Sequence, residues 1–346
     1  MQTERDLADT AASPTVRVRG PGDLVDMVPF LLGFHPAESL VLVGLSQAQV
    51  VVTVRVGLDD LAQADLLAGT VDALCRGGAE ELVGVIFDDR APPRAAHLDL
   101  PWHGVRSAVA TEADRTGIRL TELLLVSSGR WWSYLCSDAG CCPQEGQRLA
   151  PAGSVVHAAA TFAGLVALPD RGAMAALLDP SPEAERAALE PVLAAAERAV
   201  VRAVLDGRDA RQQRSVKRAL FAAARAAAPP GGLPPLPNDE VARFAVALNA
   251  YPVRDAVWMA VDDGRLDGRE LWRNLARRLP APHDAGPLFL FGWASWRAGN
   301  GALAGIAAER ALASSPAYTA ADLLLAVLSR GLDPRSLPKL RSSRPA

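Results

Sequence analysis

The chain has 346 residues, of which half are apolar and 22% are charged, and its formal net charge is −3 at pH 7. This balance is typical of a globular protein with more than one domain, and it excludes a disordered or fibrous chain. The weakly acidic charge provides no overall attraction to nucleic acid, so a nucleic-acid partner is not expected.

The N-terminal residues alternate in charge and lack the basic start and apolar core of a signal peptide, which predicts a cytoplasmic location. The most apolar late stretch, residues 287–296, has about half the length that a membrane span needs, so no span is expected. In a cytoplasmic protein the four cysteines should stay reduced and serve as thiols, ligands or packing groups.

A lead, a short strand and a helix are predicted before the first long strand. Residues 1–14 predict a disordered lead, and residues 16–19 alternate like a short strand. A helix is predicted over residues 24–32, with Asp23 as its N-cap and Gly33 as its end.

Strands and helices then alternate. Residues 39–45 and 50–56 predict two strands of a hairpin. Two units of a helix and a strand follow, at residues 58–76 with 81–87 and at residues 105–116 with 120–126. This order predicts an α/β domain with a mixed sheet over residues 15–170.

The second half changes to alanine-rich helical patterns without β-branched runs. It predicts an all-α domain of helical hairpins over residues 180–331, with a proline-rich connector at 229–237 and a flexible tail at 332–346. The last predicted helices weakly resemble a tetratricopeptide unit, at residues 287–297, 302–313 and 320–329. Helical hairpins of this kind suit binding to another protein, which is the partner we expect for this half.

The sequence motifs resemble one known family. Residues 28–44 read VPFLLGFHPAESLVLVG, residues 136–146 read CSDAGCCPQEG, and further similarity lies at 296–304 and 309–313. Together these motifs are similar to the actinobacterial family DUF4192, a domain of unknown function, over nearly the whole chain. The resemblance implies a cytoplasmic actinobacterial protein without an assigned activity, and it transfers no catalytic residue.

The segment at 136–146 follows a predicted strand at 130–135 and contains Cys136, Cys141 and Cys142. Thiolates bind soft metal ions, and a fourth ligand is available from His35 or His157. The spacing differs from the paired cysteines of structural zinc sites and from the Cys-x-x-Cys redox motif, although the adjacent cysteines allow a strained disulfide. The pattern therefore favours a packed turn with the thiols as small hydrophobes, and metal or redox chemistry remains the alternative.

A second candidate site follows the first predicted helix. His35 lies just beyond the helix C-terminus, where the helix dipole favours an imidazolium, and Glu38 and Ser39 follow it. These residues, with Glu145 of the cysteine segment, are the catalytic candidates. A rigid loop in which His35 caps the helix carbonyls explains the same residues and is the favoured interpretation.

Four further residues are candidates for lining a ligand pocket. Asp88 and Asp89 follow a predicted strand at the position where open α/β sheets place ligand-binding groups, although an ordinary turn explains them as well. Trp132 and Tyr134 alternate on one strand, so they share a face that Trp131 does not. Core packing accounts for these aromatic rings equally well.

No segment of the sequence completes a catalytic set, and none identifies a cofactor. We therefore expect a non-catalytic binding or regulatory protein. The alternative is an enzyme, with or without a metal, whose pocket is formed by the His35 and Glu38 loop and the loop at 136–146. Convergence of both loops on one pocket would favour the enzyme.

Overall fold

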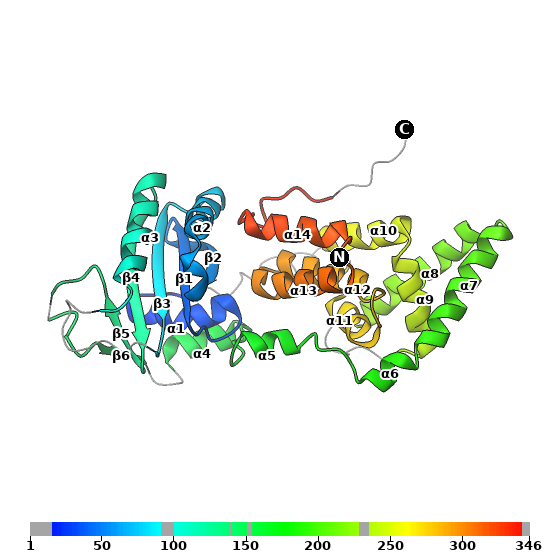
Figure 1. The fold of residues 1–346 in the computed structure, drawn as a ribbon, viewed down its shortest axis with the longest axis horizontal. Helices are drawn as coiled ribbons and strands as arrows, with labels where there is room; N and C mark the ends of the chain where they lie inside the picture. Colours follow the sequence, from blue (N-terminus) through cyan, green and yellow to red (C-terminus); the bar gives the residue numbers. More distant parts are fainter. Residues whose placement is uncertain (1–15, 91–99, 139, 151–153, 228–234, 341–346) are drawn as a thin grey trace, which may run out of the picture. The chain divides into compact units, whose positions relative to one another are not determined.

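The computed structural model describes residues 16–90, 100–138, 140–150, 154–227 and 235–340 (Figure 1). The chain divides into two compact units, Met1–Arg171 and Gly172–Ala346. Among the described residues, no helix combines the length and the apolar character needed to cross a membrane. The expected lead at 1–14 lies outside the described residues.

The first unit is built on a six-stranded sheet with the order β2-β1-β3-β4-β5-β6. Its strands are β1 (Ser39–Ser46), β2 (Gln49–Gly57), β3 (Glu81–Phe87), β4 (Arg119–Ser127), β5 (Arg130–Ser133) and β6 (Gln147–Arg148). Only the β3 and β4 pair is parallel, because a helical crossover joins these two strands, and the other neighbours are antiparallel. The predicted mixed sheet is confirmed.

The predicted hairpin of β1 and β2 is also present. Its two-residue loop places Gln47 at φ 51° and Ala48 at φ 59°. Positive φ at both central residues gives a turn whose twist matches the twist of the flanking strands. The polar loop of the sequence therefore closes the hairpin without a glycine.

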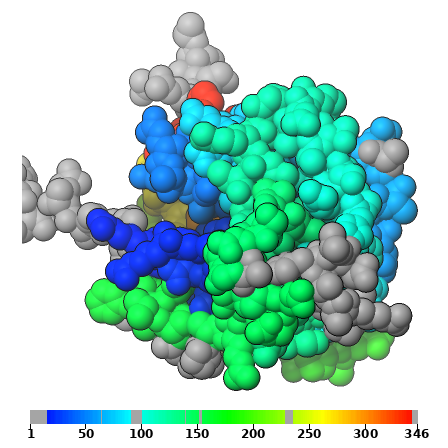
Figure 2. Space-filling model, turned by 90° about the vertical axis from the view of Figure 1, so that its left-hand side faces the viewer, coloured from blue at the N-terminus to red at the C-terminus, as the bar shows by residue number. Residues whose placement is uncertain are grey.

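Helices cover both faces of the sheet. α2 (Ala64–Arg76) and α3 (His103–Thr116) pack on one face, over a core that includes Leu42, Ile86 and Leu125. α1 (Pro21–Leu32) contacts β2 and β4 and packs against α4 (Val155–Phe162) through Met27, Val156 and Ala160. Figure 2 shows α1, in dark blue, beside the green segment that contains α4.

The first predicted elements need correction. Residues 16–19 form no strand, although they alternate, because they pair with no neighbouring strand in the described sheet. α1 begins at Pro21 with Gly20 as its N-cap, not at Asp23. The Asp23 carboxylate instead accepts a hydrogen bond from the Arg19 N–H at 2.9 Å. Proline at the first helical position accounts for the earlier start.

Three other elements differ from the expected pattern. The segment predicted as one helix at 58–76 splits into a 3-10 turn, η1 (Asp59–Ala62), and α2. β5 ends at Ser133, two residues earlier than predicted, and the chain returns to form β6. β6 has no counterpart among the predicted elements, because two residues are too short to show a strand pattern.

In the second unit, every regular element in the described part is a helix, as predicted. The helices are α5 (Arg171–Ala176), which spans the division between the units, α6 (Glu183–Ala187), α7 (Glu190–Leu205), α8 (Asp209–Ala226), α9 (Asn238–Leu248), α10 (Tyr251–Asp262), α11 (Arg269–Arg278), α12 (Ala285–Arg297), α13 (Gly301–Ser314) and α14 (Thr319–Ser329). Of the expected connector at 229–237, residues 229–234 lie outside the described residues.

α12 forms the centre of this unit, with each residue from Ala285 to Trp296 buried. Trp258 of α10 packs edge to face on Phe289 and Trp293, with ring centroids 4.9 and 5.0 Å apart. Gly292 lets α13 approach closely, since a Cβ there would lie 3.2 Å from the Ala304 carbonyl oxygen. Neighbouring helices cover α12 on all sides. This coverage explains why the helix is largely apolar around its whole circumference.

The flexible tail expected at 332–346 stays a prediction, and within it residues 334–340 make hydrogen bonds to the helical unit. The Leu340 N–H donates to Asp262 at 2.6 Å, and Arg297 donates to the Leu337 carbonyl at 3.3 Å and to the Pro334 carbonyl. Asp262 is buried and ion-paired with Arg297 at 2.5 Å. Residues 341–346 lie outside the described part.

Candidate functional site

The cysteine loop begins where β5 ends. The Ser133 hydroxyl accepts hydrogen bonds from the N–H groups of Leu135 and Cys136, at 3.1 and 2.9 Å, and donates to Glu122 at 2.7 Å. A serine that binds the backbone two and three residues ahead replaces the strand ladder with a turn. The chain therefore leaves the sheet just before Cys136.

A second turn brings the chain back to Cys136. The Asp138 carbonyl accepts the N–H groups of Cys141 and Cys142, at 3.1 and 2.7 Å, and its carboxylate accepts the Gly140 N–H at 2.8 Å. The Gln147 side chain donates to the Cys141 carbonyl at 2.8 Å. These bonds set the position of both adjacent cysteines.

Gly146 closes the loop against the aromatic ring of Trp132. It has φ 76°, and a Cβ there would lie 2.3 Å from the indole. The Trp132 Nε1–H donates to the Gln144 carbonyl at 3.1 Å, and Arg130 donates to the Gly146 carbonyl at 2.8 Å. Only glycine meets both the backbone angle and the close approach.

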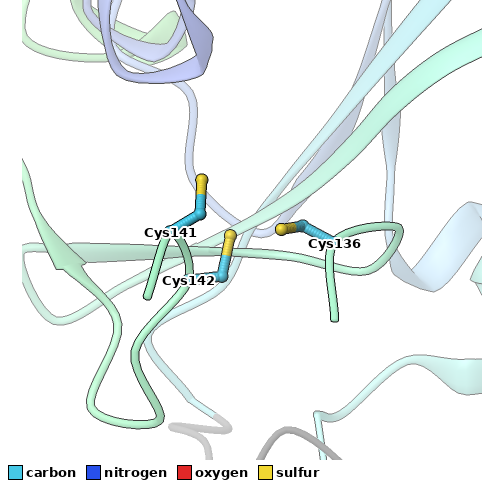
Figure 3. A group of neighbouring side chains, drawn as sticks. All are labelled: Cys136, Cys141 and Cys142. Atoms are coloured by element: carbon cyan, nitrogen blue, oxygen red, sulfur yellow. The ribbon is translucent and has the colours of Figure 1, made fainter. Parts of the chain in front are cut away.

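These turns bring the three thiols together. The Sγ atoms of Cys136, Cys141 and Cys142 all lie within 4.8 Å of one another. Figure 3 shows Cys136 pointing toward the other two from the opposite side of the loop. Cys142 is buried, Cys136 is half-buried and Cys141 is exposed, so the group lies at the surface.

In the absence of a metal, the surroundings of Cys142 favour its protonated thiol. Burial raises the pKa of Cys142 to about 12, and the neighbouring Cys136 and Cys141 thiols act in the same direction. A raised pKa removes the thiolate that a redox or nucleophilic cysteine uses. This argues against Cys142 as a reactive thiol, whereas a bound cation would stabilise its thiolate.

The spacing of the sulfur atoms is close to that of a metal site. Four sulfur ligands at the usual zinc distance lie about 3.8 Å apart, so a small contraction of the cluster would be enough. Among the described residues, no histidine belongs to this ligand group. His157 instead shares a hydrogen bond with Ser154 at 2.8 Å and packs edge to face on Phe30.

The His35 loop and the cysteine loop adjoin different strands of the sheet. β1 starts at Ser39, opposite the last residue of β3, so the loop before it extends beyond the carboxyl end of β3. β5 runs from that same end toward Leu124, and Cys136 follows it. Three strand spacings, about 14 Å, also separate β1 from β5. This placement counts against one pocket formed by both loops.

Within that loop the catalytic candidates have separate surroundings. The His35 side chain is exposed, and the backbone N–H of His35 donates to the Leu168 carbonyl at 2.9 Å. The Glu38 carboxylate is exposed and pairs with Arg90 at 3.4 Å. Ser39 is fully buried, and its Oγ has no hydrogen-bond partner in the described part of the chain. Glu145 is exposed in the cysteine loop.

Arg90 joins Glu38 to the predicted pocket residue Asp88. The buried Asp88 carboxylate accepts the Arg90 Nε at 3.0 Å and the Trp102 indole at 3.0 Å, and Arg90 also pairs with Asp59 at 3.5 Å. Asp89 accepts the Ser128 N–H at 2.6 Å. Because the Arg90 guanidinium already balances the charge of the Glu38, Asp59 and Asp88 carboxylates, this group is a poor cation site.

The predicted pocket aromatics lie in the core. Trp132 and Tyr134 pack on the sheet face that α2 and α3 cover, and Trp131 lies against Gly22 of α1. The predicted alternation of these side chains is therefore confirmed. Burial raises the pKa of Tyr134, and its hydroxyl donates to the Pro101 carbonyl.

A buried polar group between α1 and α4 was not among the predicted site residues. Asp26 is buried, and burial raises the pKa of its carboxyl, which a hydrogen bond with Ser154 and the nearby His157 partly oppose. Ser154 also caps α4 by accepting the His157 N–H at 3.2 Å. An aspartate among the apolar residues of a helix was the available signal.

The family comparison covers almost the entire described structure. A family model described as Domain of unknown function (DUF4192) matches residues 21–335. The chain belongs to this family. The match confirms the predicted family, and the matched range includes residues 136–146 of the cysteine loop. No curated protein and no solved structure matches the chain.

Proposed function

We propose that the first unit is a non-catalytic binding module that holds one soft metal ion, Zn²⁺ or Cu⁺, through Cys136, Cys141 and Cys142. The observation that carries this function is the convergence of the three Sγ atoms within 4.8 Å. Cysteine thiolates are the preferred ligands of both ions. A reducing cytoplasm, the location expected from the sequence, keeps the thiols available.

Surface exposure distinguishes this metal site from a packed turn. Thiols that only fill a core are buried, as Cys142 is, but Cys141 is exposed and Cys136 is half-buried. The open side gives an ion a path of entry and leaves a position for a water or an external ligand. Three protein ligands with one open position therefore fit a binding role.

The enzyme alternative has weaker support. The two loops that would form its pocket adjoin strands that are three strand spacings apart in the sheet, and Glu38 is ion-paired with Arg90. Binding of another protein by the helical unit stays a prediction. The exposed apolar residues of α7, Val201, Val204 and Leu205, are the surface that would serve it.

The metal site is tested on the full chain purified without chelator. We expect one metal ion per chain by elemental analysis, and a thiolate-to-metal charge-transfer band after loading with Co²⁺. Changing any one of Cys136, Cys141 or Cys142 to serine should weaken Zn²⁺ binding at least about tenfold, because a ligand is lost. Cys75→Ser, in α2 and outside the cluster, is the matched control.

The affinity should also depend on pH. A metal must displace the thiol protons, and burial keeps the pKa of Cys142 at about 12. Zn²⁺ affinity should therefore rise from about pH 6 to about pH 8, with protons released on binding. Protein that binds neither Zn²⁺ nor Co²⁺, or that loses affinity equally with Cys75→Ser, would contradict the proposal.

A further inference from the structure

The second unit contains a cavity of about 660 Å³ that none of the sequence motifs indicated. Its lining includes Lys217 and Phe221 from α8, Met259 from α10, and Lys339 and Leu340 from the segment after α14. The chain has only two lysines among 36 basic residues, and both line this cavity. Segments far apart in the sequence thus bring the ammonium groups to one place.

The buried Asp262 and Arg297 pair holds the segment that lines one side of this cavity. Asp262 accepts the Leu340 N–H at 2.6 Å, and Arg297 donates to carbonyls of the same segment. Lys339 Nζ then donates to the Asp263 carbonyl oxygen at 3.0 Å. The last described segment is therefore fixed against the end of α10, with Lys339 in the lining of the cavity.

The cavity wall carries a net charge of two positive units. Its three cationic side chains are Lys217, Arg265 and Lys339, and its one carboxylate is Asp263. Asp263 accepts hydrogen bonds from Arg265, at 3.0 Å from N and 2.5 Å from Nε, so these two side chains balance each other. In the described part of the chain, Lys217 has no hydrogen bond or ion pair. The net positive charge of the wall therefore comes from the ammonium groups of Lys217 and Lys339, which can attract an anion.

We propose that this cavity binds a small phosphate monoester with an apolar body. A phosphate monoester carries nearly two negative charges at neutral pH, which match the net charge of the wall. Lysine ammonium groups bind phosphate as compact point charges. Phe221, Met259 and Leu340 give the apolar body a surface to contact, and the volume is that of a small-molecule site.

The test measures binding of phenyl phosphate to the full-length protein by isothermal titration calorimetry. We expect saturable binding in the millimolar range or tighter, weakened by added salt because exposed charges are screened. Lys217→Gln and Lys339→Gln should each weaken binding about tenfold, which is the usual effect of losing one charge-assisted contact. The double variant should abolish measurable binding.

Two controls separate this site from general attraction to a basic helix. Arg218→Gln removes an exposed charge beside Lys217 that does not line the cavity, and it should change binding less than about twofold. Benzyl alcohol and inorganic phosphate should each bind at least about tenfold more weakly than phenyl phosphate. Benzyl alcohol lacks the phosphate group, and inorganic phosphate lacks the apolar body. Equal binding of either probe, an equal loss in Arg218→Gln, or no binding by the unaltered protein would overturn the proposal.

Discussion

Neighbouring cysteines in this chain have very different environments. Cys142 is 4% exposed and has a raised pKa, whereas Cys141 lies at the surface. The difference arises because the Asp138 carbonyl accepts both N–H groups and turns the chain at that point. One residue can therefore anchor the loop in the core while the next faces solvent, as an accessible metal site requires.

At the residue scale, Gly146→Ala should lower the free energy of unfolding by about 2 to 4 kcal/mol. The added Cβ would meet the Trp132 indole at 2.3 Å, and alanine would have to adopt φ 76°. Chemical denaturation of the full chain measures the change. Gly129→Ala is the control, since Gly129 has φ 74° with nothing within 4 Å, so only the backbone cost applies. Equal losses in the two variants would contradict the role of Trp132.

Single elements in both units are positioned by polar side chains at their ends. In the first unit, Ser133 ends β5 and starts the cysteine loop. In the second, Asp262 at the end of α10 receives the Trp293 indole at 2.8 Å and the Leu340 N–H at 2.6 Å. Both buried groups are satisfied by several donors, which is the condition for burying them without a large loss of stability.

At the scale of elements, Asp262→Ala should destabilise the protein by about 3 to 5 kcal/mol, because Arg297 would be left as a largely buried charge without its partner. Denaturant unfolding measures this loss, and limited proteolysis should show faster cleavage within residues 334–340. Asp267→Ala removes an exposed carboxylate paired with Arg269 and should cost at most about 1 kcal/mol. A loss of only about 1 kcal/mol for Asp262→Ala would show that the Asp262 and Arg297 pair does not hold residues 334–340 in place.

The whole molecule consists of two units, each with its own core. One core lies between the sheet and helices α2 and α3, and the other surrounds the buried helix α12. The division between Arg171 and Gly172 adjoins the predicted end of the α/β domain at residue 170. A core of its own is the usual requirement for a domain that folds alone.

At the scale of the whole molecule, fragments 16–171 and 172–340 should each fold when produced separately. Circular dichroism should show mixed α/β content for the first fragment and helix alone for the second, each with a cooperative thermal transition. A fragment that ends inside the helical unit, such as 16–250, serves as the control and should lack a folded second part. Loss of cooperative unfolding in either complete unit would contradict its independence.

The amino-acid sequence by itself determined the local elements and their order. Apolar periodicity and turn residues are local properties, so they predicted the hairpin of β1 and β2, the mixed sheet, the helical second half and the family. The same rules failed at residues 16–19, because an alternating pattern becomes a strand only where a neighbour pairs with it.

Only the tertiary structure decided which side chains meet. The cysteine spacing differs from that of structural zinc sites and of the Cys-x-x-Cys motif, yet two hydrogen-bonded turns bring the three Sγ atoms within 4.8 Å. Lys217 and Lys339 share a cavity because the buried Asp262 and Arg297 pair draws the later segment onto α10. Such contacts depend on packing and buried polar groups far apart in the chain, which local sequence patterns do not encode.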